Sequence, residues 1–121
     1  MAKVLIVDDS GLTRRILRRA LESAGHSIVE AEDGLQGLER YLLEKPDLVI
    51  LDMIMPGIDG LEVLARIRGV DPQARVIIST ADVQTSTRAM AQEAGASGFI
   101  NKPVDAASLL KIVGGLLNPG P

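Results

Sequence analysis

The feature of this sequence that most constrains its fold is a fivefold alternation of short apolar runs with longer stretches of helical spacing. The apolar runs predict β-strands at residues 3–7, 27–31, 47–51, 75–79 and 98–101. The first, third and fourth runs are dominated by Val, Ile and Leu, which is typical of strands buried on both faces of a parallel sheet. The sequence therefore predicts an α/β fold, a doubly wound, five-stranded parallel sheet with five helices.

Each predicted strand precedes a stretch whose apolar residues recur at three- and four-residue spacing, as on the buried side of a helix. The second stretch follows the expected capping residue Asp33, and glycines at 25, 69 and 95 are expected to end the first, third and fourth helices. The expected buried stripes are Ile16, Leu17, Ala20, Leu21 and Ala24 in the first helix, Leu35, Leu38 and Leu42 in the second, and Leu61, Leu64, Ala65 and Ile67 in the third.

Length and composition limit the function. With 121 residues the chain has room for one domain, because neither half would bury enough apolar surface alone. We assign residues 1–118 to this domain and residues 119–121 to a tail or the start of a linker. The formal net charge of −3 argues against a protein that coats nucleic acid or a membrane. There is no cysteine, and no apolar run approaches the roughly 18 residues of a membrane span, so we expect a small cytoplasmic protein.

Polar side chains gather where the predicted strands end. Asp8 and Asp9 follow the first strand, Asp52 and Thr80 end the third and fourth, and Lys102 follows the fifth. In open α/β sheets the binding site lies at the carboxyl ends of the strands, so we expect these side chains to share one edge. Three neighbouring carboxylates raise one another's pKa values unless a cation compensates. Mg²⁺ suits such a site best, because it keeps waters for a phosphate partner.

This set of residues has what phosphoryl transfer requires, namely a metal and a lysine to hold phosphoryl oxygens and a carboxylate to attack. Asp52 is the expected acceptor because it stands alone on the central strand, whereas the adjacent Asp8 and Asp9 are expected to hold the metal. Taken singly, each residue also has a structural interpretation, since an aspartate after a strand is often a helix cap or a turn former. The functional interpretation rests on their coincidence at four strand ends.

Four segments carry a resemblance to a known family: VLIVDDS at 4–10, PDLVILDMIMPGIDGLEVL at 46–64, VIISTA at 76–81 and GFINKPV at 98–104. In this order and spacing they resemble the receiver domains of two-component response regulators, in particular the single-domain, CheY-like type. The resemblance spans nearly the whole chain. It implies the flavodoxin-like strand order 2-1-3-4-5. It also implies a signalling protein that is no classical enzyme, because it assists only its own phosphorylation and dephosphorylation.

The resemblance further implies a role for each residue of the acidic set. Asp52 would be phosphorylated by a sensor histidine kinase. Mg²⁺, or Mn²⁺ in its place, would be held by Asp9, Asp52 and the backbone carbonyl of Ile54, with Asp8 assisting through water. Lys102 would pair with the phosphoryl group.

A conformational switch is implied as well. The peptide bond between Lys102 and Pro103 is expected to be cis. Thr80 would move toward the phosphate after transfer, and Phe99 would turn inward when Thr80 shifts. The surface around the fourth helix, the fifth strand and the fifth helix would then bind a protein partner, with chemotaxis as one setting. From the residues alone, Phe99 has an equally good interpretation as a core side chain, and the domain is expected to be a monomer or a weak homodimer.

Several alternatives remain open on the sequence. One is a phosphorelay intermediate that passes the phosphoryl group to a histidine on another protein. Another is a receiver domain cut from a larger regulator with a DNA-binding or enzymatic output domain. A hydrolase of the haloacid dehalogenase type is disfavoured, because Ile54 stands where those enzymes need a second acid. A nucleotide-binding module is disfavoured because no glycine-rich phosphate loop follows the first strand.

Two further interpretations concern residues outside the strand ends. A scaffold that never takes phosphate would be expected to have lost part of the acidic set, which is complete here. Four arginines of the first helix are predicted to form a solvated face rather than a nucleic-acid site, so no direct nucleic-acid or membrane binding is expected. These are Arg14, Arg15, Arg18 and Arg19.

Overall fold

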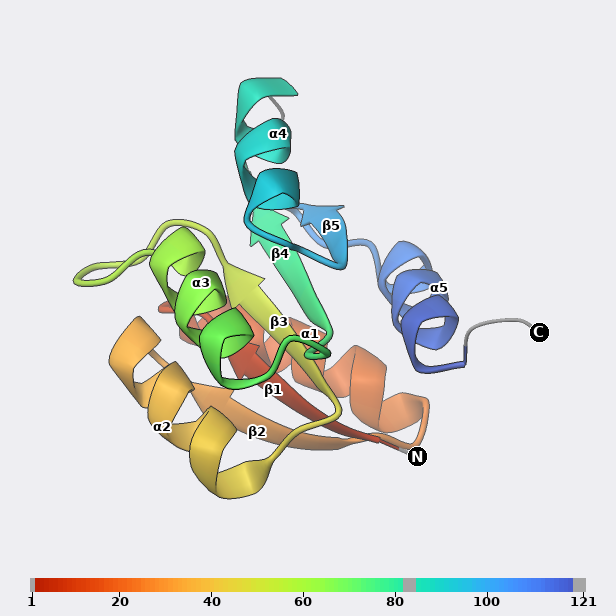
Figure 1. The fold of residues 1–121 in the computed structure, drawn as a ribbon. Helices are drawn as coiled ribbons and strands as arrows, with labels where there is room; N and C mark the ends of the chain where they lie inside the picture. Colours follow the sequence, from red (N-terminus) through yellow and green to blue (C-terminus); the bar gives the residue numbers. More distant parts are fainter. Residues whose placement is uncertain (1, 82–84, 119–121) are drawn as a thin grey trace.

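A computed structural model describes residues 2–81 and 85–118 of the chain, and within them the predicted architecture is confirmed (Figure 1). The strands are β1 (Lys3–Val7), β2 (Ser27–Ala31), β3 (Leu48–Asp52), β4 (Val76–Thr80) and β5 (Gly98–Asn101). They pair in parallel in the order β2-β1-β3-β4-β5. The helices are α1 (Gly11–Ser23), α2 (Gly34–Glu44), α3 (Gly60–Val70), α4 (Thr85–Glu93) and α5 (Ala106–Leu117).

The apolar core forms two layers, one on each face of the sheet. On one face, alternate strand residues pack with side chains of α2, α3 and α4, including Tyr41, Leu64 and Ala91. On the other face, the remaining strand residues pack with α1 and α5, including Leu17 and Leu109. Figure 1 shows α2 and α3 together in front of the sheet, with α1 behind it. Within the described residues, no helix has the length and apolar character needed to cross a membrane.

The third and fourth strands begin and end one residue later than predicted. Pairing continues beyond Leu51, because Asp52 is in register with Ser79 and the Met53 N–H donates to the Ser79 carbonyl oxygen at 3.0 Å. Asp52 and Thr80 are therefore the last residues of their strands. The hydrogen-bonded ladder thus fixes the backbone of the acceptor candidate itself.

The predicted buried stripe of α2 is wrong for two of its three leucines, because only Leu38 packs against the core. Leu35 and Leu42 are exposed, and the buried face consists of Gly34, Gly37 and Tyr41. Gly37 lets the helix approach the sheet closely, since a Cβ there would lie 2.9 Å from the Val7 side chain. Gly34 lets the start of the helix approach α3 and the loop before it, since a Cβ there would lie 2.5 Å from the Ile58 side chain. The helix therefore packs through backbone where apolar spacing predicts leucines.

The remaining helices follow the predicted pattern with smaller differences. Leu17 and Leu21 of α1 are buried, but Ile16 and Ala24 are exposed. Gly69 lies inside α3, which continues to Val70. Asp33 caps α2 as predicted, accepting a hydrogen bond from the Gln36 N–H at 2.8 Å. The prediction for a tail at 119–121 lies outside the described residues.

Candidate functional site

Three charged side chains meet at the carboxyl edge of the sheet, as the strand order requires. Asp8 directly follows β1, Asp52 ends β3, and Lys102 directly follows β5. The Nζ atom of Lys102 lies 3.0 Å from Oδ2 of Asp8 and 3.2 Å from Oδ2 of Asp52. Asp8 is 1% exposed and Asp52 is 6% exposed. One lysine therefore bridges two carboxylates that are almost entirely removed from water.

The backbone around this cluster holds the carboxylates in place. The Asp8 N–H donates to the Ala31 carbonyl at 3.1 Å, and Oδ1 of Asp8 accepts from the Ser10 N–H at 2.9 Å. Ser10, and neither of the preceding aspartates, caps α1 by accepting from the Thr13 N–H. The structural interpretation of Asp8 and Asp9 as helix caps is therefore wrong.

The negative charge of the cluster is larger than one lysine can compensate. One carboxylate oxygen from each of Asp8, Asp9 and Asp52 lies within 4.8 Å of the others. Burial, and then the charge of Asp8, raise the pKa of Asp52 despite the opposing effect of Lys102. Burial also disfavours the charged form of Lys102, but the bond to Asp8 and the charges of both aspartates outweigh it and raise the Lys102 pKa. The ionised set is thus short of positive charge.

The donor set fits a hard divalent cation. All three groups present oxygen atoms, which Mg²⁺ prefers. Burial, and after it the charge of Asp8, raise the pKa of Asp52, and a cation would offset both effects. Asp9 is exposed, so the cluster is open to solvent on one side. The Ile54 N–H lies 3.4 Å from Oδ1 of Asp52, which places this residue beside the cluster. The use of its carbonyl as a ligand stays a prediction.

The predicted switch residues lie on the neighbouring strands. Thr80 is buried at the end of β4, and its carbonyl accepts from the Lys102 N–H at 2.9 Å. The Lys102–Pro103 peptide is cis, as expected. Phe99 lies in β5 and packs partly against the core, with the guanidinium of Arg88 from α4 5.2 Å from the ring centre. This position is compatible with Phe99 as a switch residue and with Phe99 as a core side chain.

Comparison with known proteins decides the family. The family model of the response regulator receiver domain matches residues 4–114. This chain belongs to that family. It is 40% identical over 117 residues to the chemotaxis protein CheY of Bacillus subtilis, covering 96% of this chain and 98% of that protein. It is therefore a CheY-like receiver domain, and such domains are signalling proteins rather than classical enzymes.

Two further matches describe the range of relatives. The receiver domain is 36% identical over 115 residues to the response regulator MprA of Mycobacterium tuberculosis, which covers 95% of this chain and 50% of MprA. It thus spans about half the length of that relative. A crystal structure of a CheX–CheY–BeF₃–Mg²⁺ complex from Borrelia burgdorferi contains a chain that is 36% identical, with a TM-score of 0.90. That match covers 94% of this chain and 87% of the other.

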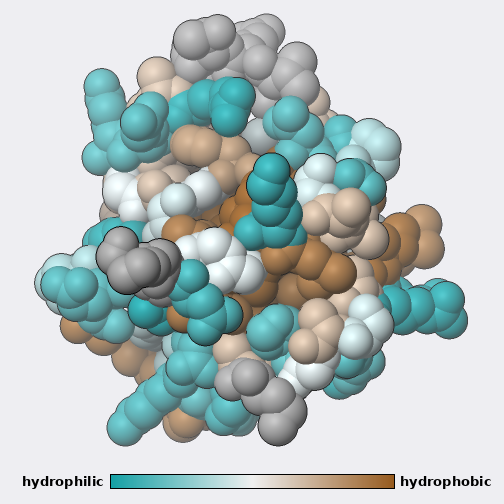
Figure 2. Space-filling model, turned by 90° about the vertical axis from the view of Figure 1, so that its right-hand side faces the viewer, coloured by the Kyte–Doolittle hydropathy of each residue, from teal (hydrophilic) through white to brown (hydrophobic). Residues whose placement is uncertain are grey.

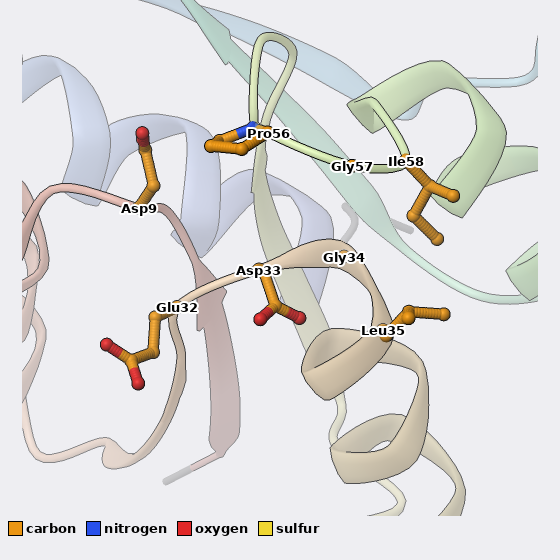
Figure 3. A pocket seen from close by; sticks show the side chains of 8 residues that line it. All are labelled: Asp9, Glu32, Asp33, Gly34, Leu35, Pro56, Gly57 and Ile58. Carbon is orange, nitrogen blue, oxygen red and sulfur yellow. The ribbon is translucent and has the colours of Figure 1, made fainter.

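A pocket opens beside the receiver domain's acidic cluster, on the side of Asp9 (Figure 3). The loop after β2 lines one edge with Glu32 and Asp33, and the loop after β3 lines the other with Pro56, Gly57 and Ile58. Figure 3 shows the Asp9 carboxylate directed away from the other two acids. Three acids, Asp9, Glu32 and Asp33, therefore line this opening.

Two residues near the site were not predicted to belong to it. The prediction of a solvated face is wrong for Arg14, whose Nη1 donates to the Asp8 carbonyl at 2.6 Å and whose Nε donates to Glu30 at 2.9 Å. Arg18 also pairs with Glu30 and with Glu22, whereas the other two arginines are exposed as expected. Glu30 in β2, an acid opposite a basic helix, is the signal in the sequence that points to this pairing.

Proposed function

We propose that this receiver domain accepts a phosphoryl group on Asp52 from a sensor histidine kinase and uses it to change a protein-binding surface. The observation that carries the proposal is the buried Asp52 carboxylate, held 3.2 Å from Lys102 in a cluster of three aspartates. Structural aspartates rarely occur in such a costly arrangement, because burying carboxylates together is unfavourable without a compensating ligand. The family of the chain supports the same function.

The transfer step uses the chain's own carboxylate as the nucleophile. An Asp52 oxygen attacks the phosphorus of a phosphohistidine, the P–N bond breaks as the P–O bond forms, and the departing imidazole takes up a proton. Lys102 then pairs with a phosphoryl oxygen in place of one carboxylate contact. Hydrolysis ends the signal: water attacks the phosphorus, inorganic phosphate leaves, and the Asp52 carboxylate is restored.

The metal complements the lysine. We assign Mg²⁺ to Asp9, Asp52 and the Ile54 carbonyl, with Asp8 assisting, and Mn²⁺ as a substitute. Bound there, Mg²⁺ would neutralise charge on the phosphoryl oxygens. Asp8 and Lys102 are already joined at 3.0 Å, so Asp8 orients the lysine as well. The Borrelia relative was crystallised with Mg²⁺ and BeF₃, which supports this assignment.

Phosphorylation is proposed to change the surface formed by α4, β5 and α5. Phosphorylation adds about −1.5 to −2 charges and three acceptor oxygens at Asp52. We assign Thr80 and Phe99 to the response, because Lys102 is bonded to the Thr80 carbonyl and Phe99 lies three residues before Lys102. Between β5 and α5, Phe99, Ile112 and Leu116 line an apolar groove with Lys111 at its edge. Figure 2, which views the side on which α5 lies, shows apolar surface in the middle of that face.

We propose that a protein partner binds this face. The Borrelia structure, a complex of CheX with CheY, supports a protein as the kind of partner. We expect the domain to act in the cytoplasm as a monomer or a weak homodimer, with chemotaxis as one setting and a phosphorelay as the alternative. A second candidate role has an observation of its own, because the domain spans half of MprA. It could be the receiver part of a longer regulator, whose output domain lies outside these residues.

The test is an intact-mass measurement after incubation with Mg²⁺ and acetyl phosphate, a small phosphodonor. We expect a gain of one phosphoryl group, about 80 Da, in the wild type and none in Asp52→Asn, whose amide is a poor nucleophile. Asp33→Asn is the matched control, since it alters an aspartate at the nearby pocket and should leave phosphorylation intact. Phosphorylation of Asp52→Asn to the wild-type extent would contradict the assignment.

A further inference from the structure

The side chain of Arg14 turns back from α1 to the loop that joins β1 to α1. Its Nη1 donates to the Asp8 carbonyl oxygen at 2.6 Å, and its Nε donates to Oε1 of Glu30 at 2.9 Å. The Arg14 side chain is only 16% exposed. The second oxygen of Glu30 accepts from Arg18, so two arginines hold this acid in place on β2. Although burial acts against it, these hydrogen bonds lower the pKa of Glu30 and keep it charged.

The carbonyl that Arg14 holds belongs to the peptide unit between Asp8 and Asp9. The Asp8 side chain has its own partners in Ser10 and Lys102. In contrast, within residues 2–81 and 85–118 the Asp9 side chain has no hydrogen bond or ion pair. Because a peptide unit is planar, fixing its carbonyl also fixes the direction in which the next residue leaves. The orientation of Asp9 therefore depends on the peptide unit whose carbonyl oxygen accepts the hydrogen bond from Arg14.

We propose that Arg14, held by Glu30, is a positioning residue that fixes the peptide between Asp8 and Asp9 so that Asp9 is presented to the divalent cation. This inference rests on the proposed function of the acidic cluster as a Mg²⁺ site. Partners that orient metal ligands typically change metal affinity by about 10- to 100-fold when they are removed. Asp9 is the exposed member of the cluster, so it gains most from such support.

Electrostatics and positioning predict opposite results for the loss of Arg14. Arg14 is a positive charge beside the cation site, and removing it would by Coulomb's law strengthen the binding of a divalent cation. If Arg14 positions Asp9, its removal weakens binding instead. A lysine at this place would keep the charge but lose the planar group that contacts two oxygen atoms at once. The pair of substitutions therefore separates charge from geometry.

The experiment is calorimetric titration of the full chain with MgCl₂, with thermal unfolding in EDTA as a check that each variant is folded. We expect the dissociation constant for Mg²⁺ to rise about tenfold in Arg14→Gln and by a similar factor in Arg14→Lys. Arg18→Gln is the matched control, because it loses contact with the same Glu30 but does not touch the loop. Its dissociation constant should stay within twofold of the wild type.

Each outcome bears on the inference. Unchanged or tighter binding in Arg14→Gln would overturn it, as would equal weakening in Arg14→Gln and Arg18→Gln. If Arg14→Gln does not fold, Arg14→Lys decides the question alone, with wild-type affinity as the contrary result. A wild type that binds no Mg²⁺ would instead overturn the proposed metal site, and this inference with it. Failure of the two ideas is thus distinguishable.

Discussion

The two sides of the receiver domain's site are packed very differently. On one side, β1 and β3 lie inside the sheet, and every residue of β3 and all but the first residue of β1 are buried. On the other side, β5 is an edge strand with one buried residue, Ile100. In α4, among residues 88–93, whose side chains the structure describes, only Ala91 is buried.

This difference separates the place where a phosphoryl group would arrive from the place that would respond. A close-packed core deforms little, so β3 presents Asp52 in a fixed position. Segments with few buried contacts rearrange at lower free-energy cost. Arg68 of α3 marks the boundary, because it donates to the Gly95 carbonyl and so anchors the chain just after α4. We infer that, when phosphorylation adds negative charge at Asp52, α4 and β5 rearrange in response, whereas β1 and β3 do not.

We call β1 and β3 the fixed side of the site, and α4 and β5 the responsive side. The largest expected effect comes from shortening a core side chain on the fixed side. Ile50 of β3 is buried in the core layer that the sheet forms with α1 and α5, and Ile50→Ala should lower the free energy of unfolding by about 2–5 kcal/mol. The control on the responsive side is Met90→Ala in α4, at a residue 55% exposed, which should change it by about 0.5 kcal/mol or less. Urea unfolding measures both. Equal losses would remove the contrast between the two sides.

Binding of Mg²⁺ at the acidic cluster of the fixed side should stabilise the folded domain. At a free Mg²⁺ concentration 100 times the dissociation constant, the free energy of unfolding should rise by about 2.7 kcal/mol, because the cation binds the folded chain only. Most of this gain should be lost in Asp9→Asn at the same concentration and retained in Glu32→Gln, an acid of the adjacent pocket. Thermal unfolding with MgCl₂ and with EDTA provides the measurement. Equal gains in both variants would place the cation elsewhere.

A smaller contrast lies within α3, which begins beside Asp52. A Cβ on Gly60 would lie 2.3 Å from the Asp52 carbonyl oxygen, so Gly60→Ala should cost about 1–3 kcal/mol of stability. Gly69, near the other end of the helix, has nothing within 4 Å of such a Cβ. Gly69→Ala should therefore stabilise the protein by about 0.5–1 kcal/mol through helix propensity. If Gly60→Ala proves neutral in urea unfolding, β3 is less fixed than we infer.

The parts of the site that the sequence predicted are those determined by strand topology. Buried parallel strands form continuous apolar runs, and their carboxyl ends meet at one edge, so Asp8, Asp52 and Lys102 could be placed together. The ladder beyond Leu51 shifted the strand bounds by one residue, but it did not move these side chains to another edge. Their roles remain predictions.

The parts that sequence reasoning missed depend on contacts between distant segments. Periodicity assigned three leucines of α2 to the core, but only Leu38 packs there. Leu35 and Leu42 are exposed, and the helix approaches β1 and α3 through the backbone of Gly37 and Gly34 instead. A basic helix face usually meets water, and only the position of Glu30 on β2 shows that Arg14 turns inward. Apolar spacing carries no information about close backbone approach or about a charge partner sixteen residues away.

The most direct test of the contrast is hydrogen–deuterium exchange, resolved by mass spectrometry, before and after phosphorylation with acetyl phosphate and Mg²⁺. We predict that exchange changes in peptides from α4 and β5 and stays slow and unchanged in β1 and β3. Asp52→Asn under the same conditions should show no such change. Equal changes on both sides of the sheet, or unchanged exchange in α4 and β5 of a fully phosphorylated sample, would contradict the account.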